Sequence, residues 1–407
     1  MIERPQKPNP LDESSWKSER TTLEGIVTWA EIDLDAIAYN VQGFKRHIGD
    51  GVKLIAVVKA NAYGHGAAPV ARAALDAGAE MLAVHRAIEG AGLRREGLQA
   101  PILIMGYTPP DGADLVIQQQ LTPSLMTFEF AQALSRRASA LGARVPVHIK
   151  VDTGMSRYGL TPEEVVDFLH SLASLPGIRL EGLFTHFATA DWVDTTNVRQ
   201  QLATFNQVRQ AAQQAGFAFP LIHAANSAAT MKLPEAHFDA VRPGIAMYGL
   251  PPSSEWPPVF EIRPALALKS KVSRVRTLPA GAGVSYSRTY VTTKPTLAAL
   301  VPVGYGDGYH RLLSNQGQVL IRGRRAPVIG RVCMDQFVVD AGNIPDVQQD
   351  DEVVLVGQQG SERIPAEEVA SLAGTINYEV TTSLLPRVAR AYLRKGEIIS
   401  VDSLDLP

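Results

Sequence analysis

LIAVVKA (residues 54–60) is a short, continuous apolar run, and such a run is typical of a strand that is buried on both faces of a sheet. The Ala-rich stretch GAAPVARAALDAGA (66–79) comes next and predicts a helix that ends near Gly78. A second apolar run, MLAVH (81–85), follows this helix. Because a strand, a helix and another strand in this order form a right-handed βαβ unit, this part of the sequence predicts an α/β fold with a parallel sheet.

The same alternation continues in both directions along the chain. Upstream, residues 26–34 predict a strand, and apolar residues then recur at helical spacing at Ile37, Val41, Phe44 and Ile48. Downstream, we expect a strand in PILIMG (101–106), strands that begin near Pro123, Val145, Arg179, Leu221 and Ala240, and helices over residues 128–142, 162–174 and 196–214. Eight or nine strands over about 225 residues fit a (β/α)8 TIM barrel. A doubly wound open sheet is the alternative, although no G-x-G-x-x-G motif follows the first strand.

The pattern changes after LPPSSEWPPVFEIRP (250–264), whose prolines indicate a domain boundary. Beyond it, short β-rich runs such as QVLIRGRRAPVIGRV (318–332) and DEVVLVG (351–357) replace the helical periodicity. Helices are expected there only around Ala366–Ala373 and near Thr381. We therefore expect a flexible N-terminal arm (1–25), a TIM barrel (26–256) and a mainly β C-terminal domain (257–407).

The composition argues against several classes of function. The formal net charge is −2 and there is no extended basic run, so neither nucleic acid nor an anionic membrane is an expected partner. No apolar stretch approaches the roughly 20 residues that span a bilayer, and the first residues lack the apolar core of a secretory signal. Cys333 is the only cysteine, which fits a reducing compartment. These features together predict a cytoplasmic protein.

Lys59 is the first candidate for chemistry, because it follows an apolar run at the C-terminal end of a predicted barrel strand. Active sites of such barrels lie at this end of the strands. Partial desolvation there would lower the pKa of the amine and favour its neutral, nucleophilic form. On position alone, however, a lysine that reaches from a strand end into water is the commoner interpretation.

The surrounding motif changes that balance. AVVKANAYGHG (56–66) is similar to the lysine motif with which the alanine racemase family binds pyridoxal 5′-phosphate (PLP). Further stretches resemble motifs of this family, in the family's order, over residues 28 to 392: TWAEIDLDAIAYN (28–40), KVDTGMSRYG (150–159), FTHFATAD (184–191), HAANSAA (223–229), VRPGIAMYG (241–249), GVSYSRTY (283–290), GYGDGY (304–309), GRVCMDQ (330–336) and TINYEV (375–380). The resemblance implies a PLP-binding TIM barrel followed by a β domain, which is the division that the sequence pattern predicts.

A PLP enzyme must bond the cofactor's aldehyde, hold its phosphate and contact its pyridine nitrogen. The resemblance assigns the aldehyde to Lys59, the pyridine nitrogen to Arg242 and the face of the ring to His186. It assigns the remaining cofactor contacts, mainly to the phosphate, to Tyr63, Asn226, Ser227, Gly244, Ile245 and Tyr378. Without the resemblance, Ser227 would be interpreted as a helix N-cap and Arg242 as half of a surface ion pair, the usual roles of these residue types.

Arg242 has a chemical consequence under this assignment. Arginine is effectively always protonated and can only donate hydrogen bonds, so the pyridine nitrogen must be an unprotonated acceptor. A neutral pyridine withdraws electrons less strongly than a pyridinium. The carbanion should then be reprotonated quickly, which suits racemisation and discourages transamination.

Racemisation also needs a base on each face of the reacting carbon. The resemblance assigns these roles to Lys59 and Tyr286, and deprotonating a free tyrosine at pH 7 costs about 4 kcal/mol. In the family a hydrogen-bonded chain that matches His186 and Arg242 offsets this cost, and the tyrosine reaches the active site of the other subunit. The resemblance therefore implies a homodimer with shared sites. Taken alone, Tyr286 would be a tyrosine that packs on one face of a sheet, and His186 a satisfied core histidine.

Further residues follow from the same resemblance. Met334 and Tyr305 match residues of the partner subunit near the substrate, and Arg157 matches an arginine near the substrate carboxylate. Lys150 matches a lysine that is carbamylated in some relatives. The sequence departs from the family at three positions: His85, Ser287, where glycine is common, and Gly306, where alanine is frequent. These departures leave the breadth of substrates open. No metal site is expected, since His65, His186 and His223 lack ligand spacing.

The leading hypothesis is a racemase that interconverts L- and D-alanine and supplies D-alanine for peptidoglycan. A broad-specificity or serine racemase would share every residue above. A PLP-dependent amino-acid decarboxylase of the same architecture places a carboxylate at the pyridine nitrogen, and Arg242 argues against it. A non-enzymatic PLP-binding protein with a lone barrel would need neither Tyr286 nor a β domain, so we rank it last.

Overall fold

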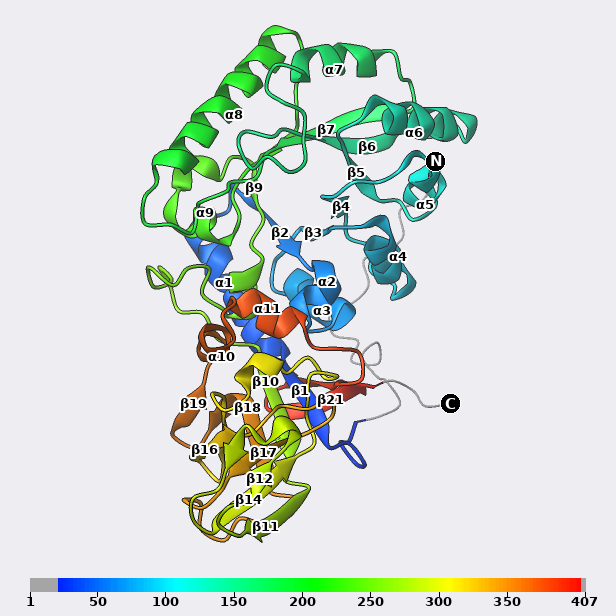
Figure 1. The fold of residues 1–407 in the computed structure, drawn as a ribbon. Helices are drawn as coiled ribbons and strands as arrows, with labels where there is room; N and C mark the ends of the chain where they lie inside the picture. Colours follow the sequence, from blue (N-terminus) through cyan, green and yellow to red (C-terminus); the bar gives the residue numbers. More distant parts are fainter. Residues whose placement is uncertain (1–20, 404–407) are drawn as a thin grey trace. The chain divides into compact units, whose positions relative to one another are not determined.

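Eight parallel strands close into a barrel within residues 36–263 of the computed structural model, which describes residues 21–403 of the chain (Figure 1). The last barrel strand pairs with the first, with Lys53 opposite Ala240 and Leu54 opposite Val241. The barrel strands are β2 Lys53–Val57, β3 Met81–Val84, β4 Ile102–Ile104, β5 Thr122–Leu125, β6 Val145–Lys150, β7 Ile178–Phe184, β8 Leu221–His223 and β9 Ala240–Val241. This closure confirms the TIM barrel and excludes the open sheet.

Helices alternate with these strands, as the apolar periodicity predicts. The α-helices are α1 Leu34–Ile48, α2 Lys59–Tyr63, α3 Ala67–Asp76, α4 Ala87–Arg95, α5 Ala113–Gln118, α6 Phe128–Ala140, α7 Val165–Ala173, α8 Thr196–Gln214 and α9 Ser227–Lys232, and the short 3-10 turns are η2 Pro110–Gly112, η3 Pro234–Ala236 and η4 Ile245–Tyr248. Strands β3 and β4 are buried along their whole length, because helices cover them outside and neighbouring strands fill the barrel inside. None of the described helices is long and apolar enough to cross a membrane.

The second unit combines the described residues up to Asp35 with those from Pro264 onward, and it is mainly β. Its large sheet has the strand order β11-β14-β17-β16-β15-β18-β10-β1-β20-β21, and β19 pairs with β18. Its elements are β1 Thr28–Asp33, β10 Leu266–Lys271, β11 Arg274–Leu278, β12 Gly283–Val284, η5 Tyr286–Arg288, β13 Tyr290–Val291, β14 Thr296–Val301, η6 Arg311–Leu313, β15 Gln318–Ile321, β16 Arg324–Ile329, β17 Phe337–Asp340, β18 Glu352–Gln359, β19 Glu362–Ile364, α10 Ala366–Ala373, α11 Asn377–Thr382, β20 Ala389–Arg394 and β21 Glu397–Asp402. The mainly β second domain is therefore confirmed.

The strand predicted at residues 26–34 forms as β1, but it belongs to the β unit and not to the barrel. It pairs antiparallel with β10 and parallel with β20. Trp29 packs there against Ala389, Ala391 and Val401. As a result, the two units divide at Asp35/Ala36 and at Arg263/Pro264, whereas we expected divisions after residues 25 and 256.

Most of the expected N-terminal arm, residues 1–20, lies outside the described residues. Of the rest, Leu23 packs against the cluster around Trp29. The described end of the expected arm is thus part of the β unit's core.

Candidate active site

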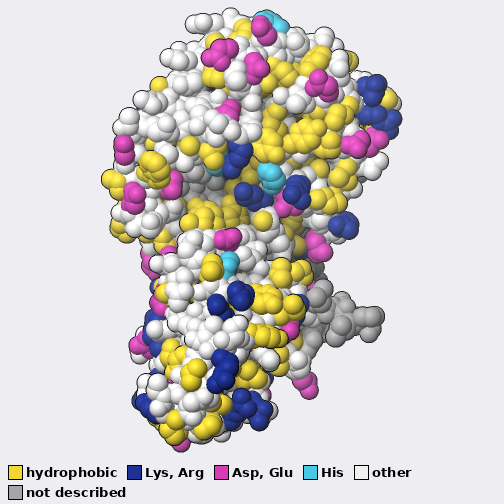
Figure 2. Space-filling model, in the orientation of Figure 1, with side chains coloured by type: hydrophobic (Ala, Val, Ile, Leu, Met, Phe, Trp, Pro, Cys, Tyr) yellow, Lys and Arg dark blue, Asp and Glu magenta, His cyan; other side chains and the backbone are white. Residues whose placement is uncertain are grey.

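The C-terminal ends of the barrel strands gather the predicted barrel residues on one rim. Lys59 follows β2, Lys150 ends β6, His186 follows β7 and Arg242 comes directly after β9. In a closed parallel barrel these ends share one face. In Figure 2, Lys and Arg side chains gather beside a His side chain on the barrel unit, which suits a ligand with negative charge.

Lys59 begins a backbone turn of unusual handedness. The four residues after it, 60–63, all have φ between 52° and 53°, in the left-handed region that non-glycine residues rarely adopt. The Ala60 amide donates to Glu89 Oε1 at 2.7 Å, and the Gly64 amide closes the turn on the Ala60 carbonyl. Lys59 itself is half-buried. Desolvation lowers the pKa of its amine, and the positive charge of Arg157 lowers it further.

A small cradle of backbone amides lies beside this turn. The Ser227 hydroxyl oxygen accepts from the amides of Gly244 at 2.8 Å and Ala246 at 3.3 Å. A Cβ atom at Gly244 would lie 2.6 Å from the hydroxyl oxygen of Tyr63, so only glycine allows this close approach. The helix N-cap considered for Ser227 is instead provided by Asn226, whose Oδ1 accepts from the Ala229 amide.

Arg242 is buried, with 3% of its surface exposed, although its charge would favour water. Its Nη2 donates to the carbonyl oxygens of Thr185 at 2.8 Å and Ala224 at 2.9 Å. It also lies 3.4 Å from Nδ1 of His186, and its Nη1 lies 2.6 Å from Nδ1 of His223. Burial lowers the pKa of Arg242 to about 9, which leaves it protonated at pH 7. This arrangement differs from the exposed ion pair that an isolated arginine would suggest.

A buried chain of side chains extends from Arg242 into the barrel wall. His223 Nε2 lies 2.8 Å from Nδ1 of His148, and Nε2 of His148 lies 3.5 Å from the carboxylate of Glu181. Burial lowers the pKa of both histidines, so both are neutral at pH 7. Gly182 makes room for the chain, because a Cβ atom there would lie 2.5 Å from Nδ1 of His148. His148 and Glu181 were missed in the sequence analysis. A polar residue within a predicted buried strand, such as β6 or β7, could have indicated a buried polar contact.

The segment after β6 is shaped by a single carboxylate. Asp152 accepts from the backbone amides of residues 154–157, and these bonds hold the pKa of its carboxyl below its usual range. Arg157, at the end of this loop, is exposed. Lys150 is buried and its Nζ donates to the Met105 carbonyl at 3.3 Å. Burial first, and then the charges of Arg242 and Arg157, lower the pKa of Lys150 to about 8.

Comparison with known proteins identifies this arrangement. Residues 32–252 match the model of the alanine racemase N-terminal domain, and residues 265–392 match that of the alanine racemase C-terminal domain. The chain belongs to the alanine racemase family. An alanine racemase of Symbiobacterium thermophilum is 48% identical over 373 residues, which are 91% of this chain and 98% of that protein. One of Desulfovibrio desulfuricans is 45% identical over 365 residues, or 90% of this chain and 98% of that protein.

A solved structure agrees with this assignment. The crystal structure of alanine racemase from Bacillus anthracis with bound L-Ala-P superimposes with a TM-score of 0.88. It is 41% identical in sequence, and the match covers 92% of this chain and 97% of that one. Both the barrel and the β unit thus have counterparts in a solved member of the alanine racemase family.

The remaining predicted residues lie in the unit that matches the family's C-terminal domain. Tyr286 is 73% exposed, and Tyr305 and Met334 are exposed as well, whereas Tyr378 on α11 is partly buried. Ser285 fixes the start of the Tyr286 turn, because its hydroxyl donates to the Arg331 carbonyl at 2.7 Å.

The residue after Tyr286 adopts a strained backbone conformation. Ser287 has φ 60°, a left-handed conformation that glycine adopts without strain. A glycine would suit that backbone, whereas serine is accommodated with strain.

Proposed function

We propose that the protein is a PLP-dependent racemase that interconverts L- and D-alanine. The observation that carries this proposal is the pairing, on one barrel rim, of a lysine of lowered pKa with a buried, donor-only arginine in a member of the alanine racemase family. We further propose that it acts in the cytoplasm and supplies D-alanine for peptidoglycan.

The rim residues fit PLP. The amine of Lys59 suits the aldehyde, and the Ile245 amide with the hydroxyls of Ser227 and Tyr63 suits the phosphate, for which the bare backbone of Gly244 leaves room. Because the Ser227 oxygen already accepts two amide protons, its own O–H proton is available to a ligand oxygen. Asn226 and Tyr378 complete the proposed contacts. When bound, PLP supplies an aldehyde that bonds amines and a ring that stabilises negative charge at the α-carbon.

Arg242 would face the pyridine nitrogen and His186 the ring. The carbonyl groups of Thr185 and Ala224 and the nitrogen of His223 fix the guanidinium, so the group is oriented before a ligand arrives. A fixed donor keeps the nitrogen unprotonated. This supports racemisation over decarboxylation, which needs a proton there.

Two bases would exchange the α-proton. The Nζ of Lys59 would remove or return it on one face, and the phenol oxygen of Tyr286 on the other. Tyr286 is exposed in the β unit, and we propose that it enters the active site of a second subunit. Large exposed apolar side chains on the same unit, such as Leu312 at 64% and Ile376 at 61%, support a homodimer.

Substrate contacts would come from both subunits. Arg157 would bind the carboxylate of the amino acid, and the partner would contribute Met334 and Tyr305. We also propose that Lys150 is carbamylated. Its lowered pKa leaves a substantial fraction of neutral amine near pH 8, and only this form bonds carbon dioxide, with loss of a proton. The carbamate would place a negative charge between Arg157 and Arg242.

The test combines a spectrum with an assay. Protein purified with PLP should show the visible absorbance of lysine-bound cofactor and form D-alanine from L-alanine. Lys59→Ala should lose both, whereas Lys53→Ala, an exposed lysine at the other end of β2, should keep both. Equal or better turnover of L-serine or L-lysine would replace the alanine assignment with a broader racemase. Carbon dioxide release without racemisation would overturn the proposal.

A further inference from the structure

Two loops of the β unit carry the side chains that the proposed function places near the substrate. Tyr305 lies in the turn after β14, and Met334 lies in the loop between β16 and β17. The loops are joined backbone to backbone, because the Tyr305 amide donates to the Cys333 carbonyl at 3.0 Å and the Gly306 amide donates to the Met334 carbonyl at 2.8 Å. A displacement of either loop therefore moves both side chains.

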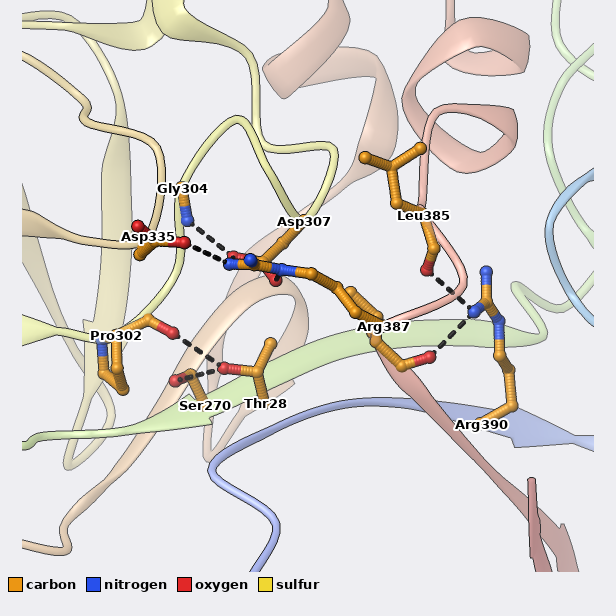
Figure 3. A network of polar contacts seen from close by, with 10 residues as sticks. Thr28, Ser270, Pro302, Gly304, Asp307, Asp335, Leu385, Arg387 and Arg390 are labelled. Atoms are coloured by element: carbon orange, nitrogen blue, oxygen red, sulfur yellow. Dashed lines mark hydrogen bonds and ion pairs between the residues drawn. The ribbon is translucent and has the colours of Figure 1, made fainter. Parts of the chain in front are cut away.

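One arginine ties both loops to a third segment. Arg387 donates through Nε to Oδ1 of Asp307 at 2.6 Å and through Nη2 to Oδ2 of Asp307 at 3.1 Å. The same Nη2 donates to Oδ1 of Asp335, the neighbour of Met334, at 2.8 Å (Figure 3). Asp307 is 5% exposed and its Oδ2 also accepts from the Gly304 amide, so its carboxylate closes the turn that bears Tyr305. We call this set of Arg387, Asp307 and Asp335 the clamp.

Hydrogen bonds to backbone carbonyl groups hold the segments at both ends of the clamp. Arg390 is buried and donates to the carbonyl oxygens of three residues around Arg387, namely Leu384, Leu385 and Val388. At the other end, the Thr28 hydroxyl donates to the Pro302 carbonyl at 3.0 Å, two residues before Gly304. Figure 3 shows the contacts of Arg390 with Leu385 and of Thr28 with Pro302 on either side of Arg387. A bidentate arginine–carboxylate pair on such supports fixes orientation as well as distance.

Gly306 fits the clamp closely. A Cβ atom there would lie 3.0 Å from the Met334 carbonyl oxygen, 3.2 Å from Met334 Cγ and 3.3 Å from Arg387 Cζ. An alanine at this position would therefore press on both Met334 and Arg387. Glycine here lets the arginine approach the turn closely.

We propose that Arg387 is a positioning residue that holds Tyr305 and Met334 in one arrangement and thereby limits the size of amino acid that the enzyme accepts. The proposal rests on the proposed function, since it assumes that these two side chains border the substrate. Without the arginine, the carboxylates of Asp307 and Asp335 lose their shared partner, and the two joined loops are no longer held against the segment that bears residue 387 and can shift together. The pocket then widens, and discrimination between alanine and larger amino acids falls.

The experiment compares Arg387→Met with Arg322→Met. Arg322 is a matched control, because it makes the same bidentate pair with a turn carboxylate in the same unit, to Asp351 at 2.8 and 3.1 Å. For each holoenzyme, kcat/KM is measured for L-alanine and L-serine, and the methyl resonances of labelled methionines are recorded by NMR. Arg387→Met should lower the alanine-to-serine ratio of kcat/KM about tenfold and shift the Met334 resonance. Arg387→Lys should restore part of the alanine-to-serine ratio, since lysine keeps the positive charge but cannot form the bidentate pair with Asp307.

The controls separate the possible failures. Arg322→Met should leave both the ratio and the Met334 resonance unchanged. A ratio in Arg387→Met equal to that of the native enzyme, or an equal change in both variants, would overturn the proposal while the racemase function stands. If the native enzyme does not racemise alanine at all, the proposed function fails; an unmoved Met334 resonance in Arg387→Met would then overturn the clamp independently of activity.

Discussion

At the scale of single residues, the turn after Lys59 is the most strained part of the described barrel. A left-handed conformation costs a non-glycine residue roughly 1–2 kcal/mol, and residues 60–63 adopt it in succession. The neighbouring structure imposes the turn, since Glu89 holds the Ala60 amide and Gly64 closes the last hydrogen bond. Strain of this kind persists where the surrounding fold over-determines a functional site.

Replacing the first strained residue should therefore stabilise the protein. Ala60 is exposed, so Ala60→Gly removes the conformational penalty without opening a cavity. After allowance for the larger entropy of glycine in the unfolded chain, we expect the free energy of unfolding to rise by about 0.5 kcal/mol. Ala211→Gly, at an exposed position in α8, should lower it by about 1 kcal/mol. Urea unfolding measures both, and equal losses in the two variants would contradict a strained turn.

Lys150 should make stability depend on pH. Its pKa is about 8 in the folded protein and 10.5 in the reference state, so between these values the unfolded chain binds more protons. The free energy of unfolding should therefore rise with pH across this window, by on the order of 3 kcal/mol once Lys150 is fully deprotonated in both states. Lys150→Met should lack this rise, whereas Lys53→Met at an exposed site should keep it. Unfolding curves from pH 7 to 11 in buffer free of carbon dioxide test this; parallel curves for native protein and Lys150→Met would refute it.

At the scale of elements, three neighbouring strands carry the chain that ends at Arg242. Arginine can only donate, so Nδ1 of His223 must accept and its proton must lie on Nε2. That proton points to Nδ1 of His148, whose own proton then faces Glu181 on β7. Each tautomer follows from the one before. The buried positive charge of Arg242 is thus connected to the partly buried carboxylate of Glu181 on β7 through two neutral rings.

The terminal carboxylate can be tested by replacement. Glu181→Leu removes the carboxylate that lies 3.5 Å from His148 Nε2, leaves that buried N–H facing an apolar side chain and should lower the free energy of unfolding by about 2 kcal/mol. Glu181→Gln should recover most of this, because its carbonyl oxygen can accept the same proton. Glu181 also pairs with Arg179, which is exposed, so Arg179→Met controls for that ion pair and should cost less than about 1 kcal/mol. Nitrogen-15 NMR of the ring nitrogens should show both Nδ1 atoms unprotonated; a protonated Nδ1 on either ring would contradict the direction of the chain.

At the scale of the whole molecule, the sequence predicts what depends on local pattern. Apolar runs located the barrel strands, and helix α8 was placed at its observed bounds. The sheet to which β1 belongs was not predictable, because its partners lie at Leu266–Lys271 and Ala389–Arg394, more than 200 residues away. The left-handed turn was also missed, since Ala60 and Ala62 give no sign of positive φ.

The candidate site divides in the same way. Residues within family motifs were predicted from the sequence, and ten of the predicted positions lie in the barrel unit: Lys59, Tyr63, Lys150, Arg157, His186, Asn226, Ser227, Arg242, Gly244 and Ile245. Residues that act through other residues were not found. His148 and Glu181 acquire their role only when β6, β7 and β8 lie side by side, and Arg387 acquires its role only when the segment before β20 meets the Asp307 turn.

The proposed sharing of active sites between two subunits would be a property of the assembly, and subunit mixing tests it. Lys59→Ala and Tyr286→Phe should each be nearly inactive alone. If each site combines Lys59 of one chain with Tyr286 of the other, a mixed dimer of the two variants has one site with both defects and one site with neither. Random exchange of equal amounts makes half of the dimers mixed, so about a quarter of native activity should return. Mixing Lys59→Ala with the double variant Lys59→Ala/Tyr286→Phe should restore nothing, because no intact pair can form. Mass spectrometry confirms that the subunits have exchanged. If the mixture of Lys59→Ala with Tyr286→Phe then recovers no activity, each chain uses its own tyrosine or none, since only sites built across two chains can recover.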